Sequence, residues 1–383
     1  MKVIQINPTI GKEDSGPSYS VTRLFEELEK HKIVSNLATL NLQLPDNFNR
    51  KNIFTFKENY FNRLGYSKSM NKWLRGQAKS SENLIFHNHG MWQINAIYTS
   101  WLKLFYNFSL VVSPRGTLSE WSLKNGNIVA KSAFWHLFQK RALNIADCIH
   151  ATGYSEYEDI RRLGFKNPVA IIPNGIDSDV FKSEAEKEKT LLFLGRIHKK
   201  KGLEPLISAW KRINLIHPDW TLKIVGTDED IYGNKGYKKQ LIQIVKSQKI
   251  KQIVFSDPLF GEEKFKEYQK SSVFILPTYS ENFGMTVIES LSQKTPAIVT
   301  HGAPWDDLNK TNSGWWIPLN EESLFETINQ ALSMTTDSLR EMGENGYKLV
   351  KESYSWHQIA KNMMDVYRWL DGEIDIPSCI ILN

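Results

Sequence analysis

The sequence predicts an α/β fold built as two domains. Short apolar runs rich in Val, Ile and Phe alternate with stretches of helical periodicity along most of the 383 residues. This alternation is typical of parallel sheets covered by helices on both faces. The first run, residues 2–7, leads into a loop with Gly11, Gly16 and Pro17 and then into a helix, which is how a Rossmann-like domain begins. A chain of this length has room for two domains of roughly 150 residues each.

The first half contains the strands of one sheet. The helix that follows the first strand carries Val21, Leu24, Phe25 and Leu28 on one face. No Gly-x-Gly-x-x-Gly follows that strand, so the pattern does not support a dinucleotide site. Further strands are expected at residues 34–40, 52–56, 84–87, 110–113, 149–151 and 170–172.

The second half repeats the alternation after a charged junction. Asn174 and Gly175 predict a turn, and the alternating charges of residues 183–189 predict an exposed linker. The expected domains are therefore residues 1–178 and 179–355, with a last helix and tail at 356–383. Strands are expected at residues 191–194, 222–226, 253–255, 273–276 and 297–299.

Composition and charge narrow the functional classes. Cys148 and Cys379 form neither a disulfide framework nor a Cys-x-x-Cys pair, which fits a reducing cytoplasm. The apolar run at residues 1–7 is too short for a signal peptide, and no window approaches the length of a membrane span.

Residues 1–178 hold 22 Lys and Arg against 14 Asp and Glu, whereas the remainder holds 26 against 28. This basic half indicates an anionic partner such as a membrane surface, or it serves solubility alone.

Residues 276–289 place two carboxylates around a strand-to-helix turn, where α/β sheets bind ligands. Gly284 lets the backbone approach a ligand, and the N–H groups of residues 284–287 would open the helix as an anion site. Glu281 and Glu289 could accept hydrogen bonds from sugar hydroxyls. The alternative is two solvated glutamates beside an ordinary helix start.

Residues 195–202 offer cations on a short turn after a strand. Gly195 turns the chain, and Arg196 and Lys201 can converge on a diphosphate. We expect Lys199 and Lys200 to be solvated. An unrelated basic turn is the alternative.

Polar residues also end two strands of the first half. His87 and His89 lack a third metal ligand nearby, so we expect no metal there. His89, next to a glycine, is placed to face a ligand, and His87 is interpreted as structural. Arg115 could bind an acceptor phosphate or form a structural salt bridge.

Two further segments are open to two interpretations. Residues 124–141 mix basic and aromatic side chains, which is typical of a helix lying on an anionic bilayer, but also of a helix with one face in the core. Asp228 and Asp230 form an Asp-x-Asp that could hold a metal, and we interpret it as a surface loop.

The sequence Ser-Glu-x-Phe-Gly-x4-Glu at residues 280–289, with Gly-Arg-x4-Lys-Gly at residues 195–202, resembles the family 4 retaining glycosyltransferases. The resemblance implies the GT-B architecture: two Rossmann-like domains with parallel sheets facing a central cleft, and a C-terminal helix crossing back to the first domain. It implies that Glu281 holds the transferred sugar, Glu289 the ribose, and His89 the region near the anomeric carbon. Arg196 and Lys201 would bind the diphosphate and neutralise the charge that develops on it.

The remaining donor contacts follow from the same resemblance. The loop at residues 15–18, with Gly16, would approach the diphosphate, or it is a plain turn. The backbone near Pro258 and Leu259 would meet the nucleobase. The loop residues that complete the donor site would be Asn282, Phe283, Gly284, Met285 and Thr286.

The activity implied is transfer of a sugar from a UDP- or GDP-linked donor with retention at the anomeric carbon, without metal or cofactor. The segments around His89 and Arg115 resemble those of bacterial surface-polysaccharide transferases, which implies a lipid-linked acceptor of O-antigen or capsule synthesis at the inner face of the plasma membrane. No nucleic acid partner is implied. A nucleotide-sugar epimerase and a non-catalytic nucleotide-sugar-binding protein are the alternatives.

Overall fold

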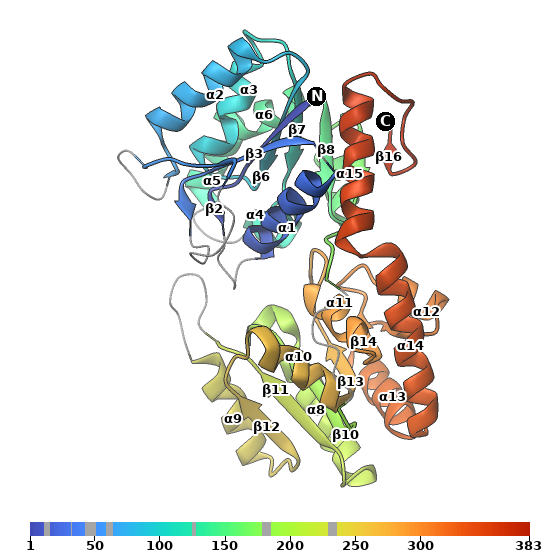
Figure 1. The fold of residues 1–383 in the computed structure, drawn as a ribbon. Coiled ribbons are helices and arrows are strands. Elements are labelled where there is room, and N and C mark those ends of the chain that lie inside the picture. The colour runs from blue at the N-terminus through green and yellow to red at the C-terminus, as the bar shows by residue number, and fades with distance from the viewer. Residues whose placement is uncertain are drawn as a thin grey trace. The chain divides into compact units, whose positions relative to one another are not determined.

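The computed structural model describes residues 1–10, 16–31, 33–42, 51–58, 64–124, 128–177, 185–228 and 236–383. The chain divides into a first unit, residues 1–175 with 356–383, and a second unit, residues 176–355. Two sheets of parallel strands with helices around them confirm the predicted α/β fold (Figure 1). The predicted boundary at residues 178 and 179 lies outside the described residues, as do Ser15 and Asp230.

The first unit is built on an eight-stranded sheet in the order β16-β9-β8-β7-β6-β1-β3-β5. All neighbours are parallel except β16, which is antiparallel to β9. A small parallel pair joins β2 to β4. The strands are β1 (Lys2–Ile6), β2 (Thr9–Ile10), β3 (Val34–Thr39), β4 (Asn41–Leu42), β5 (Ile53–Thr55), β6 (Leu84–His89), β7 (Ser109–Ser113), β8 (Cys148–Ala151), β9 (Val169–Ile171) and β16 (Ile380–Ile381).

Successive side chains of these strands enter two different cores, because a strand alternates its side chains between faces. Val3 packs with Leu24 and Leu28 of α1 and with residues of α15, whereas Ile4 packs in the core on the opposite face. Since α15 is part of the first unit, the predicted return of the C-terminal helix is confirmed. The helices are α1 (Gly16–Lys30), α2 (Lys68–Ser80), the 3-10 turn η2 (Ile94–Ile97), α3 (Tyr98–Leu102), α4 (Glu120–Lys124), α5 (Ile128–Phe134), the π turn η3 (Trp135–Gln139), α6 (Lys140–Ile145), α7 (Tyr154–Arg162) and α15 (Trp356–Leu370).

The second unit holds a six-stranded parallel sheet in the order β12-β11-β10-β13-β14-β15. Its strands are β10 (Glu188–Leu194), β11 (Thr221–Val225), β12 (Ile253–Ser256), β13 (Ser271–Leu276), β14 (Ala297–Thr300) and β15 (Gly314–Ile317). Its helices are the 3-10 turn η4 (Lys199–Lys201), α8 (Leu203–Ile216), α9 (Tyr237–Ser247), α10 (Gly261–Lys270), α11 (Met285–Ser292), α12 (Asp307–Lys310), α13 (Glu321–Leu332) and α14 (Thr336–Ser353).

The predicted exposed linker at residues 183–189 is wrong for the half-buried Lys187 and for the start of a strand at Glu188, although Glu188 and Lys189 are exposed as expected. The Lys187 ammonium donates to the Ser271 carbonyl at 2.9 Å and to Thr295 Oγ1 at 2.7 Å, and β10 already begins at Glu188. Burial lowers the pKa of Lys187 to about 7. The charge pattern predicted an exposed segment because it could not show that these carbonyl and hydroxyl oxygens receive the lysine.

Candidate active site

The candidate donor site lies in the second unit, where three loops meet. The neighbouring strands β10, β13 and β14 are parallel, so the loops after them emerge at one edge of the sheet. The Tyr279 N–H donates to the Lys200 carbonyl at 2.9 Å, and the Glu281 N–H donates to the Gly302 carbonyl at 2.6 Å. These bonds hold residues 195–202, 277–284 and 301–305 together.

Lys201 and Glu281 form an ion pair across two of these loops. Both side chains keep some exposure, 17% and 24%, so solvent reaches the pair. Burial would raise the pKa of Glu281, but the ammonium groups of Lys201 and Lys200 and the Asn282 N–H outweigh it and lower that pKa. Two residues that the sequence assigned to one site, 80 positions apart, are therefore in contact.

Lys200 is a further cation of the site that the sequence analysis missed. Lys199 is exposed as expected, but Lys200 is half-buried, and burial lowers its pKa. Arg196 is exposed on the same loop. Arg196, Lys200 and Lys201 thus share one loop, and Glu281 of the loop after β13 pairs with Lys201. The three cations outnumber this carboxylate, which leaves a net positive charge suited to a diphosphate.

Gly202 lets residues 195–202, the loop that carries Arg196, Lys200 and Lys201, lie against the loop after β13. Its φ is +63°, and a Cβ built on it would lie 1.9 Å from the Pro277 carbonyl oxygen. We expect Gly202→Ala to destabilise the second unit by more than about 2 kcal/mol. The new Cβ would force the backbone at residue 202 away from that of Pro277, and alanine is strained at a positive φ. Urea denaturation measures this loss. Gly261→Ala is the matched control, since Gly261 has a φ of +51° with open space around it. Equal losses in the two variants would show that the close approach is unimportant.

The start of α11 partly fits the predicted anion site. Gly284 has a φ of +86° and precedes the first helical residue, Met285, with Thr286 next. The Val287 N–H, however, donates to the Gly284 carbonyl at 2.9 Å. The expectation that this N–H is free is therefore wrong, because the first turn tightens on the glycine.

Glu289 is buried, and each of its oxygens has a partner in the protein. Lys264 Nζ donates to Oε1 at 2.7 Å and the Tyr268 hydroxyl donates to Oε2 at 3.0 Å. Burial, followed by the charge of Glu289, raises the pKa of Tyr268 well above its usual range. A carboxylate oxygen accepts more than one hydrogen bond, so ribose hydroxyls could add to these partners. Lys264 and Tyr268 have no spacing signal in the sequence.

The other predicted donor residues occupy different environments. The Phe283 ring is buried against Trp305, with centroids 5.3 Å apart, so a donor could meet Phe283 only through its backbone. Asn282 is partly buried beside it. Pro258 is exposed and Leu259 partly buried after β12, the edge strand. Gly16 is the first residue of α1, in the first unit.

His89 and Arg115 meet at the carboxyl ends of β6 and β7 in the first unit. Arg115 donates to His89 Nδ1 at 3.0 Å and to Asn174 Oδ1 at 2.7 Å. Since a guanidinium only donates, Nδ1 accepts, and the ring proton is on Nε2, which lies 3.2 Å from Gln5 Oε1. Burial and the charges of His87 and Arg115 lower the pKa of His89 well below its usual value. The acceptor role of Arg115 stays a prediction, and its observed contacts orient His89.

A directed chain of hydrogen bonds lies beside His89. His150 Nε2 donates to the Ile172 carbonyl at 2.8 Å, so Nδ1 of that ring accepts from Ser113 Oγ at 2.7 Å. His87 Nε2 then donates to Ser113 Oγ at 2.7 Å, and its Nδ1 accepts from the Tyr367 hydroxyl at 2.7 Å. Both nitrogens of His87 are thus engaged inside the protein, which supports its structural interpretation.

Asp228 caps a helix. Its carboxylate accepts from the N–H groups of Gly236 at 2.7 Å and Lys238 at 3.0 Å at the start of α9. Burial would raise the pKa of Asp228, but the hydrogen bonds from these N–H groups outweigh burial, so the pKa is lowered. This contact uses one oxygen of the Asp-x-Asp sequence for capping.

Comparisons with known proteins point to one family. The family described as "Glycosyl transferases group 1" matches residues 176–349, and the one described as "Glycosyltransferase Family 4" matches residues 15–180. A probable sucrose-phosphate synthase of Thermosipho melanesiensis is 26% identical over 56% of this chain and 50% of its own. A lipopolysaccharide 1,2-N-acetylglucosaminetransferase of Salmonella typhimurium is 23% identical over 53% of this chain and 57% of its own. The chain thus aligns with about half the length of these relatives.

A solved structure shares the whole fold. HepE of Anabaena, crystallised with UDP and glucose, superposes with a TM-score of 0.70 at 14% identity, covering 96% of this chain and 99% of its own. The two matched family models bear out the family that the motifs predicted, and this likeness bears out the predicted GT-B fold.

Proposed function

Because this chain belongs to glycosyltransferase family 4 and has the GT-B fold, we propose that it transfers a sugar from a nucleoside diphosphate sugar to a saccharide acceptor. The observation that carries this proposal is the contact of Lys201 with Glu281 beside Lys200, at the carboxyl ends of neighbouring strands. The cations suit the diphosphate, and the ionised carboxylate can accept hydrogen bonds from sugar hydroxyls.

The proposed transfer retains the configuration of the anomeric carbon. The bond from that carbon to the diphosphate oxygen breaks, and the acceptor oxygen bonds to the same face of the carbon. The acceptor proton moves to the departing diphosphate, whose negative charge Arg196 and Lys201 stabilise. Glu281 orients the sugar, so the protein contributes positioning and charge stabilisation without a covalent intermediate or a metal.

We propose a uridine diphosphate sugar as the donor, supported by the structurally similar HepE, which was crystallised with UDP and glucose. UDP should raise the thermal unfolding temperature of the full chain more than GDP or ADP does. A ligand at about 100 times its dissociation constant stabilises by about 2.7 kcal/mol. If no nucleoside diphosphate changes the unfolding temperature, the donor site is refuted.

Turnover assays separate transfer from the two alternatives. Incubation with the stabilising nucleotide sugar and saccharide acceptors should release UDP only when an acceptor is present. Isomerised nucleotide sugar without acceptor would instead identify an epimerase. Binding without turnover on any acceptor would identify a sensor.

We propose that the acceptor is lipid-linked, as in O-antigen or capsule synthesis, and that the first unit meets an anionic membrane. A patch of exposed apolar side chains supports this. The apolar patch comprises Trp101, Leu104, Phe105, Leu137 and Phe138. Contiguous exposed apolar side chains of this kind often mark an interaction surface. The lipopolysaccharide transferase among the relatives is consistent with a lipid-linked acceptor.

Basic side chains border the apolar patch. Trp101 lies between two hollows of about 300 Å³ and 240 Å³, one lined by Arg75 and the other by Arg141. The sequence alone could not decide whether residues 124–141 contact a membrane or pack against the core. Trp135 packs on Phe165, with ring centroids 5.9 Å apart, whereas Leu137 is 66% exposed. One face of this segment therefore packs on the core and the other is exposed. Across the described ranges, no helix combines the length and apolarity needed to span a bilayer.

We expect the chain to co-sediment with vesicles of phosphatidylglycerol and phosphatidylcholine, and Phe105→Ser with Leu137→Ser to weaken this binding at least tenfold. Each large apolar side chain that enters a lipid interface contributes about 1.5–3 kcal/mol. Leu215→Ser is the control, because Leu215 is 81% exposed in the second unit. Equal retention of the double variant and the control would remove the apolar patch from membrane binding.

A further inference from the structure

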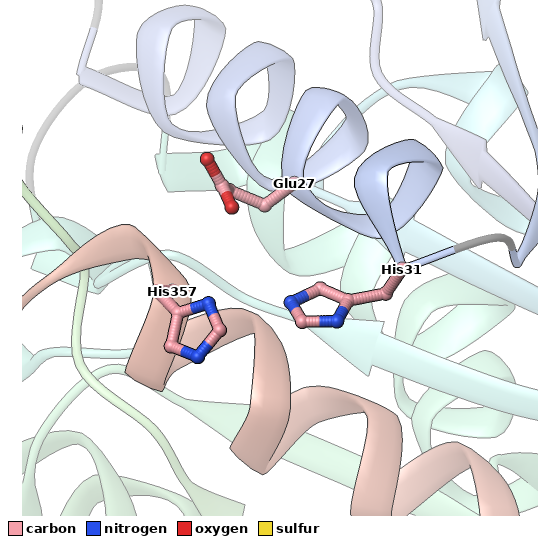
Figure 2. A group of neighbouring side chains, drawn as sticks. All are labelled: Glu27, His31 and His357. Atoms are coloured by element: carbon pink, nitrogen blue, oxygen red, sulfur yellow. The ribbon is translucent and has the colours of Figure 1, made fainter.

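Three side chains that can ligate a metal gather where α1 ends beside the start of α15, within the first unit (Figure 2). Glu27 and His31 are four residues apart, and the His31 N–H donates to the Glu27 carbonyl at 3.2 Å. The helical turn therefore continues through His31 and places both side chains on one face. His357 is the second residue of α15. One carboxylate oxygen and one nitrogen from each ring lie within 4.8 Å of one another.

The local environment leaves the cluster ready for a ligand. His31 Nε2 is buried and has no hydrogen-bond partner among the described parts of the chain. A buried polar nitrogen without a partner costs free energy, about 1–3 kcal/mol. The Glu27 carboxylate is buried, and its ion-pair partner among the residues that the structure describes is Lys30, whose side chain is 63% exposed. An ion pair with so exposed a lysine contributes little to stability, so a metal ion can replace it.

We propose that Glu27, His31 and His357 form a zinc site that joins α1 to α15. Two imidazole nitrogens and one carboxylate oxygen are a common three-residue set for zinc, and a water molecule would complete the tetrahedron. Ligand atoms in such a tetrahedron are about 3.3 Å apart. The ligand atoms, which lie within 4.8 Å of one another, would therefore approach one another by up to about 1.5 Å on binding zinc. His357 is exposed, so an ion can enter from solvent.

The zinc site would stabilise the first unit and take no part in sugar transfer. The helices α1 and α15 already pack through one core, and the Tyr19 and Trp356 rings are 6.2 Å apart between them. Zinc that binds the folded unit and not the unfolded chain raises the stability of that packing. None of the three ligands belongs to the candidate donor site, so this inference does not depend on the proposed function.

The test uses the full chain, treated with EDTA and then dialysed. Isothermal titration with zinc chloride should show one strong site, and thermal unfolding should move to higher temperature when zinc is added. His357→Asn should weaken zinc binding at least tenfold and remove the thermal shift, with a circular dichroism spectrum like that of the original protein. His136→Asn is the control, because His136 is an exposed histidine of the same unit outside the cluster.

Two further variants make the test specific to this cluster. Glu27→Gln should weaken zinc binding like His357→Asn, whereas Lys30→Ala should strengthen it, because the competing ammonium is gone. Cobalt in place of zinc should give the visible absorption of a tetrahedral ion, and His357→Asn should abolish it. Zinc affinity equal in His357→Asn and His136→Asn, or the absence of a strong site, would overturn the proposal.

Discussion

Replacing Glu281 or Lys201 by alanine is expected to lower turnover at least a hundredfold while the protein stays folded. The two side chains contact each other on loops at the edge of the second sheet, and solvent reaches both of them. On the proposed mechanism, loss of the carboxylate removes the group that would orient the sugar, and loss of the ammonium removes charge stabilisation from the departing diphosphate. Removing one donor that stabilises a transition state typically costs 10²–10³ in kcat.

The measurement is kcat at saturating donor and acceptor, with circular dichroism to verify folding. Lys199→Ala is the matched control, since Lys199 is an exposed lysine of the same turn and should keep its activity. Turnover within tenfold of the original in either Glu281→Ala or Lys201→Ala would refute the roles proposed for this pair.

Acidification below about pH 6.5 is expected to destabilise the first unit strongly. Burial lowers the pKa values of His87 and His89 well below their usual range and that of His150 to about 3, with neighbouring positive charges adding to the shifts. Below about pH 6.5 these histidines bind protons in the unfolded chain but stay neutral in the folded protein. Stability is therefore full above about pH 6.5 and is lost as the pH falls toward the folded pKa values.

The expected loss at about pH 5 relative to pH 8 is roughly 2 kcal/mol for His150, and His87 and His89 add to it in the same direction. Urea denaturation at several pH values in this range measures it. His150→Gln should reduce the dependence by about 1.4 kcal/mol per pH unit, because one proton no longer binds on unfolding. His136→Gln, at an exposed position, should leave it unchanged. A stability that stays level from pH 8 to 5 would contradict the buried neutral rings.

The strands and the donor motifs could be predicted because their signals are local. A short apolar run such as residues 273–276 is by itself enough to indicate a buried strand. Glu281 and Glu289 likewise lie within one turn and the helix that follows it, so their spacing can be read from the sequence. The strand β15 was harder to predict, because Gly314 begins it and Trp315 and Trp316 do not alternate with polar residues.

The partners of the site residues could not be predicted, because tertiary packing selects them from distant segments. Tyr367 reaches His87 across 280 positions, and nothing in the spacing of either residue indicates it. Lys264 approaches Glu289 from α10, a separate helix. Lys200 resembles its solvated neighbour Lys199 in sequence, but Tyr279 N–H and Thr278 Oγ1 of the next loop both donate to the Lys200 carbonyl, and the spacing of the lysines does not indicate this.

The first unit is interrupted in the chain by the whole of the second, and this has a consequence during synthesis. Residues 176–355 emerge from the ribosome and can fold while the surface of Val3, Ile85 and Val111 still lacks the helix that covers it. That apolar surface stays open to chaperones or to aggregation until residues 356–370 appear. A nascent chain stalled before α15 should therefore be protease-sensitive in its first 175 residues and resistant in its second unit.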